Sequence, residues 1–449
     1  MTTETEIEDI SVPDGWTSST LGELADEERG ITYGIVQPGQ NTIDGVPIIR
    51  VQNLADGTLD TSDVMRVAPE IAAKYRRTCL RGGELLLSLV GSVGSSVIAP
   101  PEIAGWNTAR AVAVVPLRPG VDARYVRFCL RSAPLQHLME VWCNTTVQAT
   151  LNLADVSRLP IPMPTQRERE AIVEALGALD DKIELNQRMN RAVEHLLAVL
   201  FRSWFVDFDP VVAKAAGRQP VHLRPALSAL FPATFQDSPL GPIPHGWEVK
   251  PIGDVVKVVG GSTPSTNEPK FWSGDIAWAT PRDLAALTDP VLIATDRQIT
   301  AAGLDQIGSG LLPKGTVLLS SRAPIGYTAI ADIPVAVNQG FIALICDGPL
   351  PNYYVIEWVR ENMDTIEGNA NGTTFMEISK KNFRPIAAIV PPPDVLEKLI
   401  EIASPWWRQI IHNVRESRTL AALRDTLLPK LLSGELRVKQ AEKQVEAHT

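Results

Sequence analysis

The sequence predicts an α+β protein in which two similar mixed α/β domains are separated by two long antiparallel helices that form an intramolecular coiled coil. Three observations predict this fold. The chain of 449 residues contains one long internal repeat, each copy opens with short β-rich runs, and each copy closes with a long segment of heptad spacing. A tandem duplication of this kind implies a pseudo-twofold relationship between the copies.

The repeat relates the two halves of the chain at an almost constant offset. It is visible in separated blocks, in which Trp16 matches Trp247, Gly83 matches Gly315 and Asn186 matches Asn413. These offsets are 231, 232 and 227 residues. They exclude a solenoid, whose repeats span about 20 to 50 residues. The chain is therefore one two-part module written twice.

The first part of each copy is a mixed globular domain. Short β-rich runs such as Glu84–Leu89 and Phe341–Ile345 are bounded there by Gly and Pro. The predicted segments are an acidic tail 1–13, domain 14–164, a long helix 165–208, a Pro-rich linker 209–243, domain 244–391, a second long helix 392–436 and a tail 437–449.

The second part of the first copy predicts one long helix. Its seam positions recur at alternating steps of four and three residues: Ile172, Leu176, Leu179, Ile183, Asn186, Asn190, Val193, Leu197 and Leu200. Thr165 and Glu168 form a capping-box pair, and no proline follows before Pro210. We expect a helix of about 40 residues, or about 60 Å.

The equivalent seam of the second copy is Leu399, Ala403, Trp406, Ile410, Asn413, Ser417, Leu420, Arg424 and Leu427. This helix should start near Asp394, bend at Pro429 and end at Gly434. Each seam can bury its apolar stripe by pairing with the other, and the pseudo-twofold makes the pair antiparallel. Asn186, Asn190 and Asn413 are interpreted as register-setting polar core residues rather than ligands.

Composition and motifs argue against a membrane protein and against an enzyme. No apolar run reaches about 18 residues and the acidic start is unlike a signal peptide, so a cytoplasmic location is expected. The four cysteines lack C-x-x-C spacing, which argues against a zinc site. The Gly-rich stretches 91–96 and 260–263 lack the lysine of a phosphate-binding loop and are interpreted as turns.

The charge balance leaves a nucleic-acid partner undecided. The net charge is −10, and residues 14–163 hold 13 basic and 15 acidic side chains, against 11 and 15 in residues 244–390. Local basic clusters nevertheless occur at 74–81, 124–131 and 380–384, and these can contact phosphates or remain a solvated surface. The acidic pair Asp180 and Asp181 is expected on a solvated helix face.

Three separated segments carry a resemblance to a known family. They are LFRSWFVDFDPV at 200–211, LGPIPHGWEVKPIGDV at 240–255 and LLPKLLSGEL at 427–436. Together with the duplication, they resemble the specificity subunit of type I restriction and modification systems over nearly the whole chain. The two globular domains then correspond to target-recognition domains.

The resemblance implies a non-catalytic subunit that binds double-stranded DNA. In that family each recognition domain reads one half of a split target, and the helices set the distance between the halves. The resemblance also implies two methyltransferase subunits docked on the helices, a motor-nuclease subunit, and no membrane partner. S-adenosylmethionine, ATP and magnesium are expected on those partners, with no cofactor in this chain.

No motif within the two domains identifies the base contacts. The candidate base contacts are polar and arginine positions in loops, most of them repeat-equivalent: Arg50, Gln52, Asn53, Arg76, Arg77, Asn107, Arg110, Thr145 and Thr146 in the first domain, and Thr280, Arg282, Arg322, Asn338, Gln339, Thr373 and Thr374 in the second. For each of them, a structural role is at least as good an interpretation: the side chain would form hydrogen bonds with backbone groups of a turn.

Two other functions remain open. One is a coiled-coil scaffold that binds protein partners and not DNA. The other is a self-contained DNA-modifying enzyme, which would require a methyl-donor or nuclease motif that we do not find in the sequence. Methyl transfer by the chain alone would favour the enzyme, and the absence of a protected DNA site in the complex would favour the scaffold.

Overall fold

The computed structural model describes residues 13, 15–55, 58–143, 150–221, 223–372 and 376–436. The predicted tails, 1–13 and 437–449, lie outside these ranges apart from Pro13. The chain divides into two compact units: unit 1 comprises Met1–Glu184 and Thr419–Thr449, and unit 2 comprises Leu185–Arg418. The predicted α+β fold, with its two long helices, is confirmed.

Unit 1 contains short strands followed by helices. The strands are β1 (Thr17–Thr20), β2 (Thr32–Tyr33), β3 (Val46–Ile49), β4 (Leu54–Ala55), β5 (Thr58–Leu59), β6 (Met65–Val67), β7 (Leu85–Ser88), β8 (Ser96–Ile98), β9 (Asn107–Thr108), β10 (Val112–Val115) and β11 (Pro160–Met163). The helices are α1 (Leu21–Leu24), α2 (Pro69–Ala72), α3 (Ala123–Arg131), α4 (Ala133–Trp142) and α5 (Leu153–Arg158), with 3-10 turns η1 (Val51–Asn53), η2 (Arg76–Thr78) and η3 (Pro101–Ile103).

Unit 2 repeats this order. Its strands are β12 (Phe235–Gln236), β13 (Ile243–Pro244), β14 (Glu248–Pro251), β15 (Lys257–Val259), β16 (Trp272–Ala279), β17 (Val291–Leu292), β18 (Arg297–Ile299), β19 (Val317–Ser321), β20 (Ile325–Ala331), β21 (Ala336–Val337), β22 (Phe341–Ile345) and β23 (Ala387–Val390). Its helices are α7 (Asp209–Ala215), α8 (Pro225–Ser228), α9 (Ile252–Val255), α10 (Pro281–Ala285), α11 (Ala301–Leu304), α12 (Asn352–Glu361), α13 (Met363–Gly368) and α14 (Lys380–Phe383), with the 3-10 turn η4 (Pro269–Phe271).

The strand topology shows the duplication directly. In unit 1 the sheets run β1-β11, β2-β10-β7-β8 and β6-β3-β9, with a small β4-β5 pair. In unit 2 they run β14-β23, β15-β22-β19-β20-β17 and β18-β16-β21, with a small β12-β13 pair. The first three sheets of each unit correspond strand for strand, and β17 is an addition to the second copy. The sequence repeat therefore reflects a structural repeat.

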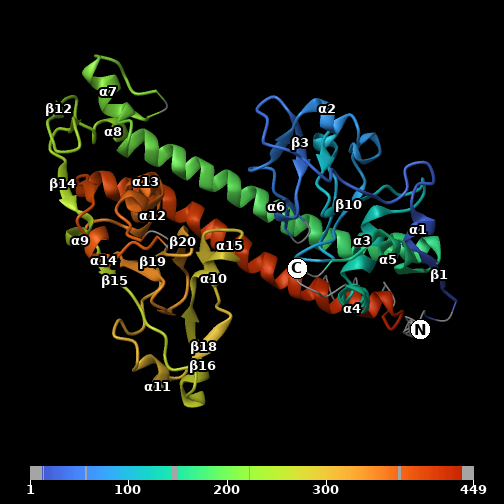
Figure 1. Cartoon of the computed structure of the whole chain (residues 1–449). Coiled ribbons are helices and arrows are strands. Elements are labelled where there is room, and N and C mark those ends of the chain that lie inside the picture. Colours follow the sequence, from blue (N-terminus) through green and yellow to red (C-terminus); the bar gives the residue numbers. More distant parts are fainter. Residues whose placement is uncertain are drawn as a thin grey trace. The chain divides into compact units, whose positions relative to one another are not determined.

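Helix α6 (Gln166–Phe205) begins in unit 1 and ends in unit 2, whereas α15 (Pro393–Leu432) begins in unit 2 and ends in unit 1. Each has 40 residues and is drawn as one uninterrupted ribbon in Figure 1. The Thr165 hydroxyl accepts from the Glu168 N–H at 3.4 Å, while Glu168 accepts from the Thr165 N–H at 3.2 Å, so the predicted capping box caps α6.

The second long helix ends beside Gly434, the residue that the sequence predicts as its end. Helix α15 continues through Pro405 and extends three residues beyond Pro429, to Leu432. Gly434 follows with φ of +70°, and the Leu436 N–H donates to the Lys430 carbonyl at 3.0 Å. This left-handed glycine closes the helix, because a residue without Cβ adopts positive φ at little cost.

The two helices pair within each unit, and the pairing in unit 2 is antiparallel. Asn186 donates to the Ser417 hydroxyl at 3.3 Å, and one turn further Asn413 donates to Asn190 Oδ1 at 2.8 Å. Asn190 also donates to Asp289 at 2.9 Å. The three asparagines are buried. They are polar core residues, as predicted, and each needs an opposite partner, which favours one register.

Most of the remaining seam positions are also buried. In unit 1, Leu176 and Leu179 of α6 belong to one apolar core with Leu427 and Leu431 of α15. In unit 2 the seam prediction needs one adjustment. Trp406 is partly buried, while its neighbour Trp407 is buried and stacks on Tyr353 with ring centroids 5.9 Å apart.

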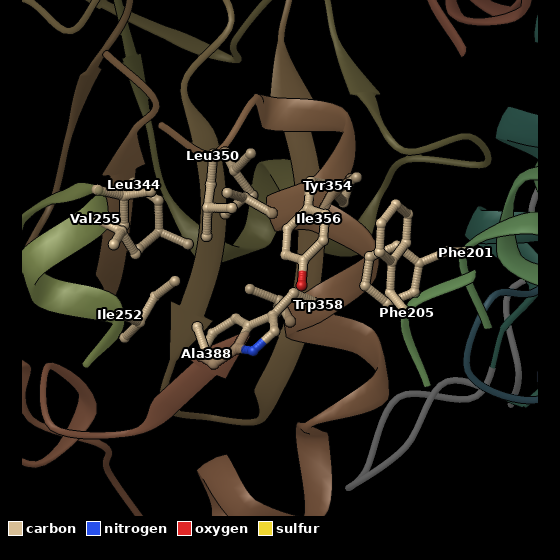
Figure 2. Packing of buried hydrophobic residues seen from close by; sticks show 14 of the residues in the cluster. Phe201, Phe205, Ile252, Val255, Leu344, Leu350, Tyr354, Ile356, Trp358 and Ala388 are labelled. Atoms are coloured by element: carbon tan, nitrogen blue, oxygen red, sulfur yellow. The ribbon is translucent and has the colours of Figure 1, made fainter. Parts of the chain in front are cut away.

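The aromatic end of α6 anchors the core of unit 2. Figure 2 shows Phe201 and Phe205 beside Tyr354 of α12, and both ring centroids lie 5.0 Å from that of Tyr354. The Tyr354 hydroxyl donates to the Ile389 carbonyl at 2.8 Å, which satisfies its polar end. Each large side chain buried in this way contributes roughly 1.5–3 kcal/mol, so the helix is firmly joined to its domain.

The Pro-rich linker is packed against this core. Val211 of α7 and Phe231 are buried, and the Phe231 ring meets Trp204 of α6 at 5.2 Å between centroids. Trp204 and Trp247 are both buried in this core. The linker therefore continues the fold of unit 2 from the end of α6 to β14.

Candidate nucleic-acid interface

Most of the candidate residues that lie in the described ranges follow two neighbouring parallel strands. In unit 1, β3 pairs with β9 in parallel, with Ile49 opposite Thr108. In unit 2, β16 pairs with β21 in parallel, with Ala279 opposite Val337. Because parallel strands end on the same side of a sheet, the residues after them lie together. We call residues 50–53 with 109–110, and residues 280–283 with 338–339, the parallel-strand edge of each unit.

The local backbone of this edge is the same in both units. The Arg50 N–H donates to Asn53 Oδ1 at 2.9 Å, and the Thr280 N–H donates to Asp283 Oδ2 at 2.8 Å. This shared turn makes Gln52 the structural equivalent of Arg282. The strand register likewise makes Arg110 the equivalent of Gln339.

Glycine lets a loop pass closely over this edge in both units. A Cβ on Gly34 would collide with the Thr108 carbonyl, and one on Gly261 would collide with the Val337 carbonyl. The loops are held there by the bonds from the Ile35 N–H to Thr108 O, 2.6 Å, and from the Ser262 N–H to Val337 O, 3.1 Å. The interpretation of 260–263 as a simple turn is therefore incomplete, since Gly261 permits a close backbone approach.

Each edge exposes one arginine and one glutamine. Gln52 and Arg110 are exposed in unit 1, and Arg282 and Gln339 are exposed in unit 2. The two residue types therefore exchange places between the copies. Gln339 is oriented by the Thr263 hydroxyl, which donates to its Oε1 at 2.7 Å. Arg50 lies beside Gln52 but forms an ion pair with Asp63 at 3.2 Å.

The structure removes two asparagines from the candidate set. Asn53 and Asn107 are each only 2% exposed. Asn53 donates to the carbonyls of Asp60 and Asp63, and Asn107 donates to the Tyr75 carbonyl. Their amide groups form hydrogen bonds with backbone carbonyls inside the domain, so neither side chain can reach a ligand in this conformation. Asn107 is also equivalent to Ala336 by strand register, and not to Asn338.

Two further candidates on the edge of unit 2 support the backbone. The Thr280 hydroxyl donates to Asp283 at 2.7 Å, and Asn338 Oδ1 accepts from the Gly340 N–H at 2.8 Å. Both side chains are partly buried. They fix the turn that carries Arg282 and Gln339, and the turn interpretation describes them best.

Arg322 reaches the same edge from another strand. It follows β19, whose last residue, Ser321, donates its N–H to the Gly340 carbonyl at 2.8 Å. Its guanidinium forms an ion pair with Glu377 at 3.6 Å, and both side chains are substantially exposed. Arg322 remains a candidate. Thr145, Thr146, Thr373 and Thr374 lie outside the described residues.

The basic cluster of η2 is divided between structural and free side chains. Arg77 donates from Nε to the Arg29 carbonyl at 3.0 Å, which fastens the loop before β2. Arg29 in turn pairs with the buried Glu84 at 2.6 Å. Arg76 is exposed. Of the two, Arg76 is the better placed for a phosphate.

The predicted basic face of α3 is not a phosphate-binding surface. Arg127 and Arg131 are nearly buried and pair with Asp180 of α6 at 3.1 and 3.4 Å, and Arg424 of α15 pairs with the same carboxylate at 2.7 Å. The prediction of a solvated Asp180 is wrong, because its side chain is 18% exposed. Burial alone would raise the pKa of Asp180, but the Arg424 hydrogen bond and the three guanidinium charges hold it below its ordinary value.

Sequence reasoning missed a cation–π cluster beside the edge of unit 2. The guanidinium carbon of Arg297 on β18 lies 3.6 Å from the ring centroid of Trp272 and 5.4 Å from that of Trp278. The two tryptophans lie six residues apart in one β-rich run, so a strand period of two could have placed them on one face. Arg297 itself carried no such signal.

A second surface on α6 was also missed. Leu185, Met189, Leu196 and Val199 are 39–51% exposed, and their spacing places them on one helix face over about 21 Å. We call them the apolar stripe. Exposed Arg188, Arg191 and His195 flank it. The repeat-equivalent positions of α15 are His412, Glu416, Leu423 and Thr426, so the stripe belongs to the first copy.

Neither surface has the ligands of a metal centre. Within the described residues, no three His, Cys, Asp or Glu side chains converge as a metal-binding group. Among the helices of the described ranges, none is long and apolar enough to cross a bilayer. The arrangement offers hydrogen bonding and apolar contact to a partner molecule.

Comparison with known proteins gives one family. The sequence model described as "Type I restriction modification DNA specificity domain" matches residues 13–195 and again 244–414. The chain is 35% identical over 188 residues to the type I restriction enzyme MjaIX specificity subunit of Methanocaldococcus jannaschii. That alignment covers 41% of this chain and 43% of the relative, so it spans less than half of that protein.

A longer match is the type I restriction enzyme HindI specificity subunit of Haemophilus influenzae. It is 25% identical over 327 residues, covering 63% of this chain and 70% of the relative. Among solved structures, the type I restriction-modification S subunit from M. genitalium aligns with 94% of this chain and 97% of its own. The identity is 16% and the TM-score is 0.49.

Proposed function

Because the chain belongs to the family of type I restriction-modification DNA specificity subunits, we propose that it selects the DNA target of such a complex and reads a bipartite double-stranded site. Each target-recognition domain, 14–164 and 244–391, binds one half-site. The observation that carries this proposal is the repeated parallel-strand edge, with an exposed Arg and Gln exchanged between equivalent positions.

Those side chains suit base recognition in the major groove. Arginine donates two parallel hydrogen bonds to O6 and N7 of guanine, and glutamine pairs with N6 and N7 of adenine. Exchanging the two at equivalent positions changes the base preference while the backbone stays the same. This supports two domains of one fold that read different half-sites.

The division of labour explains how an acidic chain can bind DNA. Two linked readers bind one duplex with a high effective concentration, so each half-site needs only modest affinity. Partner subunits can add the phosphate contacts that the net charge of −10 does not favour. We assign no catalytic step to this chain. S-adenosylmethionine, ATP and magnesium belong to the methyltransferase and motor-nuclease subunits.

The apolar stripe supports docking of a methyltransferase subunit on α6. Its four exposed apolar side chains form a continuous surface on a rigid helix, and such a surface is costly to leave in water. The flanking Arg188, Arg191 and His195 favour a partner helix with acidic residues beside its apolar face. The docking of an amphipathic helix would cover the stripe.

Footprinting of the chain together with its methyltransferase subunits tests the proposal. We expect two protected segments separated by an unprotected gap, and methylation of adenines within them. Absence of protection, with the protein complex intact, would favour the coiled-coil scaffold. Methyl transfer by the chain alone would favour the self-contained enzyme.

A matched insertion in both helices tests whether they set the gap. Asp180 pairs with Arg424 and Asn190 with Asn413, so seven residues added after Ile183 need seven added after Arg418 to keep both pairings. A heptad adds about 10.5 Å of helix. We expect a longer gap between unchanged half-sites, measured by methylome sequencing. Changed half-sites with the original gap would contradict this role.

A further inference from the structure

We propose that Arg297 reads a guanine in the half-site bound by unit 2, held in position by Trp272 and Trp278. This inference rests on the proposed function and deepens it, because it assigns a base-specific contact to one residue. The pattern of the loops does not identify Arg297, which lies on a strand. Its assignment depends on the geometry around it.

The two tryptophans orient the guanidinium. Arg297 lies over Trp272 at 3.6 Å, and the indoles of Trp272 and Trp278 meet at 5.0 Å and 85°. Both indole N–H groups are fixed, since Trp272 donates to the Ser265 carbonyl at 2.9 Å and Trp278 to the Ser262 carbonyl at 3.3 Å. A guanidinium stacked on a ring keeps its N–H donors in its own plane, directed away from that face.

The backbone beneath Arg297 belongs to the parallel-strand edge. Arg297 lies directly opposite Trp278 across β16 and β18, two residues before Thr280. The Asp296 N–H donates to Asp283 Oδ1 at 2.7 Å, and Asp283 also caps the turn that carries Arg282. Arg297 is therefore joined by hydrogen bonds to the turn of Arg282.

The donors of Arg297 remain available to a ligand. Its side chain is exposed, and in the parts of the chain that the structure describes no carboxylate forms an ion pair with it. It lines a hollow of about 360 Å³ together with Trp272, Ser273, Asp296 and Gln298. The Arg297 guanidinium, the Gln298 amide and the Ser273 hydroxyl can together bond the several donors and acceptors on a base-pair edge. A phosphate needs only the positive charge.

Fixed orientation favours guanine over the backbone. Phosphate contacts are satisfied by a point charge on a flexible side chain, as lysine provides. A two-point contact to O6 and N7 needs a planar fork in one orientation, and the indole platform supplies that orientation before binding. In unit 1 the equivalent positions are Met65 and Ile48, so the contact is specific to the second domain.

The test compares Arg297→Ala, Arg297→Lys and Arg218→Ala in the full chain expressed with its methyltransferase subunits. Arg218 is exposed in the linker, so its replacement removes the same charge elsewhere. Methylome sequencing gives the motif of each variant. Binding to duplexes with single base changes gives the discrimination at each position.

We expect both Arg297 variants to relax one G·C position of one half-site, with a loss of about 10- to 100-fold in discrimination there. Arg218→Ala should leave the motif unchanged. A different result would make Arg297 a phosphate contact and overturn the inference. In that case Arg297→Ala would lose the same affinity for every DNA sequence, Arg297→Lys would restore it, and the slope of log affinity against log salt would correspond to about one counterion fewer. An unchanged motif in all variants would overturn it too. If the wild-type complex protects no bipartite site, the proposed function itself fails.

Discussion

Replacement of Asp180 by alanine is expected to lower the free energy of unfolding of unit 1 by about 3–5 kcal/mol, because it removes the carboxylate that three nearly buried guanidinium groups share. Arg127 and Arg131 come from α3 and Arg424 from α15, and their side chains are 8–10% exposed. One carboxylate therefore holds the domain and both long helices of this unit together. Thermal unfolding monitored by circular dichroism measures the loss.

Asp181 provides the matched control. It is the neighbouring carboxylate and pairs with Arg124 at 3.0 Å, but both side chains are at least half exposed. Asp181→Ala should therefore change stability by no more than about 1 kcal/mol. Equal effects of the two substitutions would show that burial of the cluster contributes nothing.

The same cluster predicts an acid limit to stability. The folded pKa of Asp180 lies below its unfolded value, which is near 4. Its contribution is therefore complete above that unfolded value and is lost as the pH falls through the lower folded pKa. The difference in stability between the wild type and Asp180→Ala should shrink below about pH 4.

Replacement of Val199 by glutamate is expected to weaken retention of the methyltransferase by about 30-fold or more, because a charge would be buried against an apolar partner. Val199 is 51% exposed, so the substitution leaves the core of the chain intact. Affinity purification of the co-expressed complex, followed by titration of the separated subunits, measures the effect.

The repeat supplies a control for this variant in the same molecule. Thr426 occupies the position equivalent to Val199 on α15, is exposed, and lies outside the apolar stripe. We expect Thr426→Glu to leave the affinity within about twofold of the wild type. Similar losses from both substitutions would mean that the partner recognises helix position instead of the stripe.

The architecture could be predicted because its signals are local and repeated. Heptad spacing between adjacent helical turns predicts which residues of α6 and α15 face each other. The asparagines stand at heptad positions that are otherwise mostly apolar, which predicts that they are polar core residues. Duplication then supplies a second, independent reading of the same pattern. The glycine signal is equally local, since Gly434 has a positive φ two residues after the last residue of α15.

The candidate site was only partly predictable because exposure depends on distant contacts. Gln52 and Asn53 are adjacent polar residues, yet one is exposed and the other is buried against the carbonyls of Asp60 and Asp63. Arg297 depends on Trp272, 25 positions earlier, across a strand pair. Composition and spacing describe neither relationship.

The ion cluster shows the same difficulty at longer range. The acidic pair with Asp181 predicts that Asp180 faces water, but its partners come from positions 127, 131 and 424. At the repeat-equivalent position of α15 stands Trp407, which stacks on Tyr353. The two copies thus fasten domain to helix at the same place with different chemistry, which a search for repeated residue types overlooks.

Because unit 1 is completed by the segment that begins at Thr419, this protein cannot finish its first half while the ribosome is still producing the second. Glu184 is synthesised about 235 residues before that segment. At about 5–20 residues per second, the delay is on the order of 10 to 50 s. During this time Leu176 and Leu179 lack the α15 side chains of their core, and Asp180, which pairs with Arg127 and Arg131, lacks Arg424. Nascent-chain aggregation, or capture by a chaperone, is the hazard that this interleaved order of synthesis creates.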